Sequence, residues 1–361
     1  MNHTSEIASP KKILIVRLGA MGDIIHALPG AMILRGSLSE SKIGWIVEKR
    51  WTELLRWRSG EIRLPDIVHE VDTRTWRKNL GSPAMWREIS RAIRAVRAEK
   101  YDLVVDFQGA MKSAILAQLS GATKRYGFAE AWEKPASLFY THPIHVEQRH
   151  VVNRNVALAV QVAKKEFNDF QGGFYKLGPE NDDLQLWAAR KLRQLDLAGQ
   201  FAILNPGAGW GAKQWPADRY AEVARALGQL GMRSLINYGP GEQALAQEVE
   251  SKSEGHAIAA SFTISELIAI TQRASLFIGG DTGPMHLAAL MHVPVVAIFG
   301  PTDPARNGPY GTDNIVLRDP ASITSHKRNR DPEAGLLNIT TDQVLKAARQ
   351  LLSNQTEGVR T

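Results

Sequence analysis

Residues 12–34 read KILIVRLGAMGDIIHALPGAMIL, and this stretch decides the fold. Lys12–Leu18 is a short apolar run rich in Ile, Leu and Val. Such a run is too short for a helix and predicts a buried parallel strand. Gly19–Asp23 then predicts a tight turn, and Ile24–Leu34 predicts a helix. A strand followed by a glycine turn and a helix is typical of an α/β protein.

The same alternation runs through the rest of the chain. Further strands are predicted at Ile43–Val47, Ile67–Val71, Leu103–Asp106, Phe201–Asn205, Arg233–Tyr238, Leu276–Gly279 and Pro294–Phe299. Helices are predicted at Trp86–Arg97, Lys112–Leu119, Asn153–Lys165, Ala217–Leu230, Gln243–Lys252, Ile264–Arg273, Pro284–Met291 and Thr341–Leu352. This pattern predicts two successive Rossmann-like domains, each a parallel sheet covered on both faces.

The length of 361 residues also favours about two domains. The segment Phe167–Asp183 is polar and interrupted by Gly and Pro, which is typical of a linker. We predict an N-terminal domain over 1–170, a linker over 171–183, a C-terminal domain over 184–335, and a C-terminal helix and tail over 336–361. One option for that helix is packing back on the N-terminal domain. Since ligands of open α/β sheets bind beyond the carboxyl ends of the strands, we expect the site in the glycine turns there, in a cleft between the domains.

Composition excludes several classes of protein. The chain has no cysteine, which excludes disulfides, thiolate zinc sites, iron–sulfur clusters and a cysteine nucleophile. Its longest apolar runs, such as Val293–Phe299, are about seven residues, whereas a transmembrane helix needs roughly 20. Met1–Lys12 is polar, so we predict no secretory signal.

The positive charge is concentrated in the N-terminal half. Residues 1–165 hold 26 lysines and arginines against 16 acidic residues, whereas residues 166–361 hold 18 against 21. The excess could be a solvated face, a surface for a polyanionic substrate or an anionic membrane, or a nucleic-acid site. No zinc finger, RNP aromatic motif or KH-type loop supports nucleic acid, and we predict no nucleic-acid partner.

A first chemical motif is GDTGPMH at residues 280–286. It follows a predicted strand and opens a helix, and a helix N-terminus of this kind suits a phosphate or diphosphate. Thr282 and His286 are four residues apart and so share a helix face. The alternative is a strand–helix turn that Asp281 merely caps.

Two more glycine turns follow predicted strands in the C-terminal half. NPGAGWGAKQWP at 205–216 offers backbone donors and Lys213, a compact cation that suits a phosphate oxygen; the alternative is a surface loop. YGPGE at 238–242 ends in Glu242. Glu242 could accept hydrogen bonds from a ribose diol or could stabilise the start of a helix.

In the N-terminal half, RLGAMGDIIHALP at 17–29 places Asp23 at the start of a helix. This carboxylate is either a helix cap or a general base that takes a proton from a hydroxyl. DFQGAMK at 106–112 is a second turn at a strand end, where Gln108 and Lys112 could line the acceptor side. The basic segment Ser322–Pro332 is predicted to be a loop.

Other familiar motifs are missing. No GxGxxG follows the first strand, and there is no DxD pair, HExxH or GxSxG. We therefore predict neither a cofactor nor a metal.

Taken together, RLGAMGDIIHALP, DFQGAMKSA, NPGAGWGAKQWP, YGPGE, GGDTGPMHLAA and FGPTDP resemble the motifs of the bacterial lipopolysaccharide heptosyltransferases, in order and spacing, from Lys12 to Gly311. The resemblance is nearest to the heptosyltransferase I type, which builds the inner core. It implies a GT-B fold and an inverting, metal-independent transfer of heptose from ADP-heptose to a Kdo or heptose hydroxyl. It also implies a Kdo–lipid A acceptor and a peripheral position at the cytoplasmic face of the inner membrane.

The resemblance assigns roles residue by residue. Asp23 matches the general base, Lys213 a donor-phosphate ligand, and Asp281 an acidic residue of the donor site. Thr282, Gly283 and His286 match the diphosphate-binding turn of the donor site, and Glu242 matches a ribose-contacting acid more loosely. The basic stretch of Arg74, Arg77 and Lys78 loosely matches the acceptor-binding region. Two other classes stay open: an epimerase or other nucleotide-sugar enzyme, and a non-catalytic protein that binds nucleotide sugars or a membrane surface.

Overall fold

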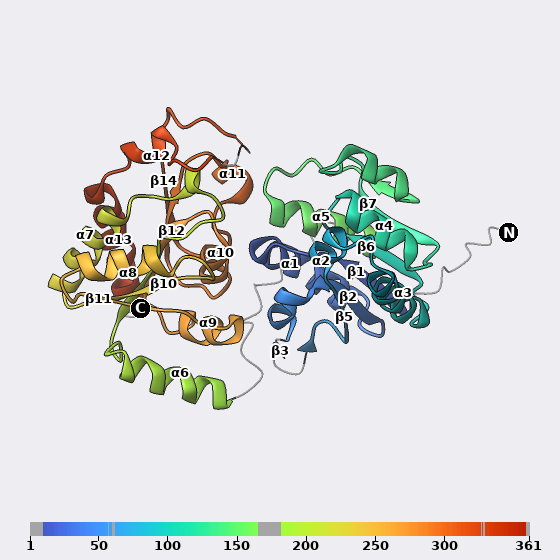
Figure 1. Ribbon diagram of the computed structural model, residues 1–361, viewed down its shortest axis with the longest axis horizontal. Coiled ribbons are helices and arrows are strands. Elements are labelled where there is room, and N and C mark those ends of the chain that lie inside the picture. Colours follow the sequence, from blue (N-terminus) through green and yellow to red (C-terminus); the bar gives the residue numbers. More distant parts are fainter. Residues whose placement is uncertain are drawn as a thin grey trace. The chain divides into compact units, whose positions relative to one another are not determined.

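The computed structural model describes residues 10–164 apart from 57, 60 and 61, and residues 182–358 apart from 326 and 328. The chain divides into two compact units, Met1–Tyr175 and Lys176–Thr361. The predicted linker falls almost wholly outside the described residues. The units are described separately below (Figure 1).

The N-terminal unit is built on a six-stranded, all-parallel sheet in the order β5-β2-β1-β6-β7-β8. Its strands are β1 (Lys12–Val16), β2 (Lys42–Glu48), β5 (Ile67–Val71), β6 (Leu103–Asp106), β7 (Lys124–Phe128) and β8 (His142–Ile144). Its helices are α1 (Met21–Ser37), α2 (Thr73–Lys78), α3 (Pro83–Ala98), α4 (Met111–Leu119) and α5 (Val151–Ala163). Short helical turns η1 (Lys49–Leu55) and η2 (Lys134–Phe139), and a hairpin of β3 (Arg58–Ser59) and β4 (Ile62–Arg63), complete the unit.

Helix α1 covers one face of this sheet and is buried along most of its length. From Met21 to Leu34 every residue except Asp23 is buried, so the helix is apolar all round, as a helix packed on both sides must be. Asp23 is thus a polar exception in an otherwise buried segment. On the opposite face, α3 and α4 cover a core that includes Leu14, Val104 and Leu116.

The C-terminal unit repeats the same topology. Its sheet is all-parallel in the order β11-β10-β9-β12-β13-β14. The strands are β9 (Phe201–Asn205), β10 (Arg233–Asn237), β11 (Ala257–Ala260), β12 (Leu276–Gly280), β13 (Val295–Phe299) and β14 (Asn314–Arg318). The helices are α6 (Asp182–Gln194), α7 (Ala217–Gln229), α8 (Gln243–Lys252), α9 (Ile264–Thr271), α10 (Gly283–Leu290), α11 (Pro304–Asn307), α12 (Ala334–Asn338) and α13 (Thr341–Gly358), with a turn η4 (Gly211–Lys213). When the six strands of each sheet are numbered 1 to 6 in chain order, both sheets have the order 3-2-1-4-5-6, which is the Rossmann arrangement.

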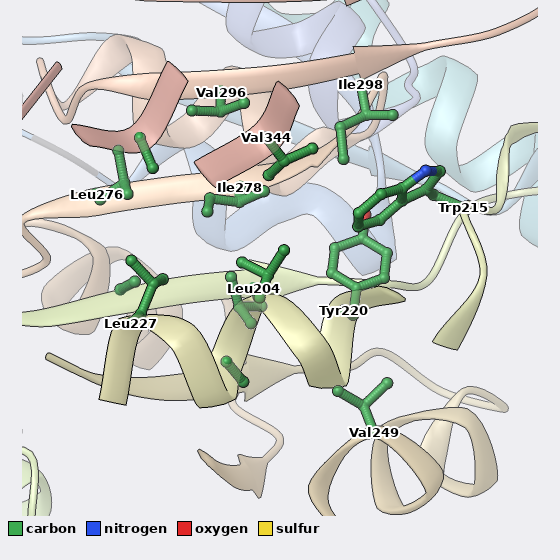
Figure 2. Close-up of a cluster of buried hydrophobic side chains, with 14 of the residues drawn as sticks. Leu204, Trp215, Tyr220, Leu227, Val249, Leu276, Ile278, Val296, Ile298 and Val344 are labelled. Atoms are coloured by element: carbon green, nitrogen blue, oxygen red, sulfur yellow. The ribbon is translucent and has the colours of Figure 1, made fainter. Parts of the chain in front are cut away.

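Side chains of successive strand residues enter opposite layers of this second unit. Leu204 and Ile278 face α7, α8 and α13, whereas Ile203 and Phe277 face α6, α9 and α10. Figure 2 shows the first layer, with Trp215 and Tyr220 at one end and Leu227 at the other. The two rings of Trp215 and Tyr220 pack edge to face with centroids 5.0 Å apart.

Helix α13 completes the core of the C-terminal unit. Its apolar side, with Val344, Ala348 and Leu351 fully or almost fully buried, belongs to the core of the C-terminal unit, where it packs on α7, β13 and β14. In Figure 2, Val344 lies beside Ile278 and Val296. The apolar side of α13 is thus filled within its own unit, and the expected option of packing on the N-terminal domain stays a prediction.

Candidate functional site

The predicted site residues follow equivalent strands in the two units. In each sheet the first and fourth strands are neighbours, and the chain turns to opposite sides after them; ligands of doubly wound sheets bind beside this point. The loops after these strands, together with the first turns of the helices that follow them, carry most of the predicted site residues: Asp23, Gln108 and Lys112 in the N-terminal unit, and Lys213, Asp281, Thr282, Gly283 and His286 in the C-terminal unit.

Lys213, Asp281 and His286 form one buried charged cluster. The Lys213 Nζ donates to Asp281 Oδ2 at 2.7 Å and to the Asp281 carbonyl oxygen at 3.2 Å. The other carboxylate oxygen, Oδ1, lies 3.2 Å from His286 Nε2. The side chains of Lys213 and Asp281 are only 14% and 8% exposed, so this pair is shielded from bulk water. Lys213 and Asp281 are separated by 68 positions along the chain, so the fold and not the local sequence makes the contact.

Asp281 stays ionised in this setting. Burial by itself would raise the pKa of Asp281, but the His286 hydrogen bond and the Lys213 ammonium outweigh burial and hold the pKa of this carboxyl below its usual 3.8. A permanently charged carboxylate fixes the position of the Lys213 ammonium. The Lys213 Nζ also lies 4.7 Å from the centre of the Trp210 ring, a cation–π distance.

The N-terminus of α10 lies directly beside this cluster. Thr282 is its N-cap and Pro284 lies in the first turn, but no side chain caps the helix. The interpretation of Asp281 as a simple cap is therefore wrong, since its oxygens contact Lys213 and His286 instead. Free backbone N–H groups next to a lysine ammonium make a good site for a diphosphate.

Glu242 belongs to the same edge of the sheet. Its Oε2 accepts a hydrogen bond from Gly239 N at 2.9 Å. A Cβ on Gly207 would lie 2.2 Å from the Glu242 carboxyl carbon, so this carboxylate lies directly against the loop after β9. It occupies the N-cap position of α8 but makes no capping hydrogen bond. The geometry brings Glu242 to the Gly207–Lys213 loop that the sequence singled out.

Asp23 is held by two groups of its own unit. Arg17 Nη2 lies 2.7 Å from Asp23 Oδ1, and Ala20 N donates to Asp23 Oδ2 at 2.9 Å. The Asp23 side chain is still 46% exposed, whereas that of Arg17 is 8% exposed. The bond to Ala20 N belongs to the first turn of α1, so Asp23 does contribute to the helix start, while its exposure leaves it open to a substrate hydroxyl.

Sequence reasoning missed Arg17, which links the two loops of this unit. Its Nη1 donates to the Phe107 carbonyl oxygen at 2.6 Å. The neighbouring Leu18 N donates to Gln108 Oε1 at 2.9 Å. An arginine at the end of the apolar run KILIVRL was the available signal, because a buried guanidinium needs a partner.

A fully buried carboxylate, Asp106, shapes the second loop. Its oxygens accept hydrogen bonds from Gln108 N at 2.8 Å and from Tyr140 Oη at 2.8 Å. Burial raises the pKa of Asp106, although these hydrogen bonds oppose the shift. Asp106 thus holds the turn that presents Gln108 and the Phe107 carbonyl.

The predicted acceptor cations lie on the surface. Arg74, Arg77 and Lys78 are exposed on α2, and Lys112 is exposed in the first turn of α4. Within the described residues, no hydrogen bond or ion pair joins them to Asp23 or Gln108. The structure therefore brings Gln108 to the loop of Asp23 but leaves the α2 cations as a separate patch.

No group of three or more His, Asp or Glu side chains in the described part of the chain could hold a metal ion. No described helix has the length and apolar content needed to cross a membrane.

Comparison with known proteins agrees with this architecture. The model of glycosyltransferase family 9 (heptosyltransferase) matches residues 89–336. Lipopolysaccharide heptosyltransferase 1 of Escherichia coli (strain K12) is 29% identical over 94% of this chain and 100% of its own length. The structure of E. coli heptosyltransferase WaaC with ADP-2-deoxy-2-fluoro heptose has a TM-score of 0.75 and 26% identity, covering 94% of this chain and 99% of that one. The glycosyl transferase family 9 structure from Veillonella parvula has a TM-score of 0.80 and 25% identity, covering 95% and 98%.

These matches span both units and confirm the predicted fold class, two Rossmann-like α/β domains of the GT-B type. The family match runs from α3 in the first unit to α12 in the second, and so includes the Lys213–Asp281–His286 cluster. The chain belongs to glycosyltransferase family 9, the heptosyltransferase family.

Proposed function

We propose that this heptosyltransferase transfers heptose from ADP-heptose to a Kdo hydroxyl of the lipopolysaccharide inner core, with inversion and without a metal. The observation that carries the donor half is the buried Lys213–Asp281–His286 cluster beside the uncapped start of α10. The names of the similar proteins, a lipopolysaccharide heptosyltransferase and an ADP-heptose analogue complex, support the choice of sugar nucleotide and acceptor.

In the donor half, the diphosphate of ADP-heptose binds the backbone N–H groups of Thr282 and Gly283 and the Lys213 ammonium. Negative charge builds on the diphosphate as the bond to the anomeric carbon breaks. Lys213 and the helix N-terminus stabilise that charge, which is the role a metal has in other transferases. Glu242, against the same loop, accepts hydrogen bonds from the ribose hydroxyls.

In the acceptor half, Asp23 acts as the general base. It takes the proton of the acceptor hydroxyl while that oxygen bonds to the anomeric carbon and the bond from this carbon to the diphosphate oxygen breaks. The electron pair of the broken bond leaves with ADP. Because attack and departure occur on opposite faces of the sugar, the anomeric configuration inverts. Gln108, Lys112 and the α2 cations bind the anionic acceptor.

The basic side of the N-terminal unit also suits an anionic membrane. Helix α3 presents Arg87, Arg91 and Arg94 as an exposed stripe, three or four residues apart, and Arg97 is exposed near its end. Within the described residues none of these guanidinium groups has an acidic partner. Trp86, in the first turns of the same helix, is 54% exposed. Exposed arginine and tryptophan side chains on one helix are typical of peripheral binding to anionic lipid, here at the cytoplasmic face of the inner membrane.

The test is release of ADP from ADP-heptose with and without a Kdo-terminated lipid A acceptor. The wild type should release ADP only with acceptor, Asp23→Asn should lose this activity yet still bind ADP, and Lys213→Ala should weaken ADP binding. The Asn variant keeps an oxygen for the Ala20 N–H and so preserves the helix start. Turnover without acceptor would point to an epimerase or another nucleotide-sugar enzyme. Binding of ADP with no turnover in the wild type would point to a binding protein.

A further inference from the structure

The short limb Asn329–Glu333, from the basic loop after β14, is bound to the turn that carries Lys213. Ala212 N donates to the Asn329 carbonyl oxygen at 3.1 Å, and Glu333 N donates to the Ala212 carbonyl oxygen at 3.2 Å. A single residue of the η4 turn is thus held from both sides by one limb. The side chains of residues 329–332 are exposed, so the limb acts through its backbone.

Gly211 and Gly280 show how closely this turn is enclosed. A Cβ on Gly211 would lie 1.5 Å from the Arg330 carbonyl oxygen, a distance that no side chain tolerates. On the other side, a Cβ on Gly280 would lie 3.3 Å from the Lys213 carbonyl oxygen. The η4 turn therefore lies in a slot between the limb and the end of β12, with a glycine at each close approach.

Glu333 anchors the limb at its far end. Its carboxylate accepts hydrogen bonds from Leu336 N at 2.9 Å, from Ser322 Oγ at 3.0 Å and from Ile323 N at 3.4 Å. The Glu333 side chain thereby caps α12 and binds Ser322 and Ile323 at the other end of the loop. The backbone N–H of Glu333 binds the Ala212 carbonyl oxygen. Loss of this carboxylate would release the limb and would also uncap α12, whose Leu336 belongs to the core, so the test below separates positioning from destabilisation.

We infer that the limb Asn329–Glu333 is a positioning element for Lys213 and that Gly211 and Glu333 set the affinity of the site for the diphosphate of the donor; this rests on the proposed function of Lys213. The Lys213 ammonium can contact a diphosphate only if the η4 turn stays in this slot. Asp281 fixes the side chain of Lys213, and the limb fixes the backbone of the turn. Gly211 and Glu333 act through Lys213 and touch no reacting atom.

The experiment measures the Kd for ADP by calorimetry on the full chain. Gly211→Ala should raise the Kd about tenfold, the loss expected when one charge-assisted hydrogen bond is misplaced. Gly209→Ala is the matched control, since a Cβ there meets nothing within 4 Å and the residue lies in the same loop. Glu333→Ala should act in the same direction as Gly211→Ala, whereas Asp331→Ala, an exposed carboxylate of the same limb, should not.

A double-mutant cycle separates positioning from simple destabilisation. In the Lys213→Ala background, Gly211→Ala should leave the Kd unchanged, because the group it positions is gone. Equal loss in both backgrounds, or a lowered Tm with an unchanged Kd for ADP, would overturn the inference. If Gly211→Ala does not fold, the cycle is run with Glu333→Ala. A Kd that Lys213→Ala does not alter would instead refute the donor site itself, and the inference with it.

Discussion

Arg17 and Asp23 form an ion pair across the first turn of α1, with Arg17 Nη2 2.7 Å from Asp23 Oδ1. The guanidinium is buried and also bound to the Phe107 carbonyl oxygen, so it cannot follow the carboxylate if that moves. The carboxylate is therefore presented in one orientation, with one face toward solvent. In a general base this orientation selects which hydroxyl loses its proton.

Arg17→Met should lower kcat without weakening ADP binding. The methionine keeps much of the side-chain volume but frees the Asp23 carboxylate to rotate, and we expect a loss of about tenfold or more in kcat. Asp23→Asn should lose more, about 10²–10⁴-fold, the usual contribution of a general base. Steady-state rates with saturating donor check both values. A kcat for Arg17→Met equal to that of the wild type would show that the ion pair has no part in catalysis.

Asp281→Asn should change how stability depends on pH. The pKa of Asp281 in the folded chain lies below its usual 3.8, so ionised Asp281 stabilises the fold at every pH above about 4, and this contribution is lost as the pH falls below that value. Near pH 7 the variant removes the negative charge that neutralises the buried Lys213 ammonium, a cost of about 3 kcal/mol. Thermal unfolding from pH 7 to pH 3 should show a gap in Tm between the two proteins that narrows below pH 4. The exposed Asp331→Asn serves as control, with no gap at any pH.

Removal of divalent metals should leave the rate unchanged. The charge that builds on the leaving diphosphate is met in the proposed mechanism by Lys213 and the start of α10, both part of the chain. Rates measured before and after treatment with EDTA, and after addition of Mg²⁺, check this expectation. A rate that disappears with EDTA and returns with Mg²⁺ would contradict it.

The arginine stripe of α3 should control binding to anionic vesicles. Arg87→Gln with Arg91→Gln removes two of its charges, and co-sedimentation with vesicles that contain phosphatidylglycerol should drop several-fold at low salt. The matched control is Arg190→Gln with Arg193→Gln on α6, which removes the same charge from another exposed helix. Equal loss in both pairs would mean that only net charge matters.

Leu351→Ala should destabilise the C-terminal unit. Leu351 of α13 is 3% exposed in the core shown in Figure 2, and truncation of such a leucine costs about 2–5 kcal/mol. Leu230→Ala, at a side chain that is 61% exposed, should cost far less. Urea unfolding of the two variants gives the comparison.

Apolar strands were predictable from the sequence because burial on both faces leaves a continuous hydrophobic run. Leu103–Asp106 and Phe201–Asn205 have the predicted bounds for this reason. Lys124–Phe128 was missed because KRYGF has a half-exposed, polar pattern near the edge of the sheet. The short helix α12 was missed because its five residues are too few to show a period.

Site residues were predictable where a glycine turn follows a strand, since that order places backbone donors at the carboxyl edge. The residues that contact them could not be predicted from the sequence. The contact of Lys213 with Asp281, and the support of Ala212 by Glu333, join residues far apart in the chain, and only the topology brings them together. The roles of Asp23 and of the α2 cations stay predictions.

The repeated strand order has a consequence for how such enzymes diversify. Each unit is a complete sheet with its own core and its own pair of loops after the first and fourth strands. The core residues of each unit come from that unit alone, so substitutions in the loops of one unit do not alter the core residues of the other. In the proposed mechanism the donor binds one unit and the acceptor the other, so the two preferences could evolve separately. A chimera that joins the first half of one family member to the second half of another would then combine the donor of one with the acceptor of the other.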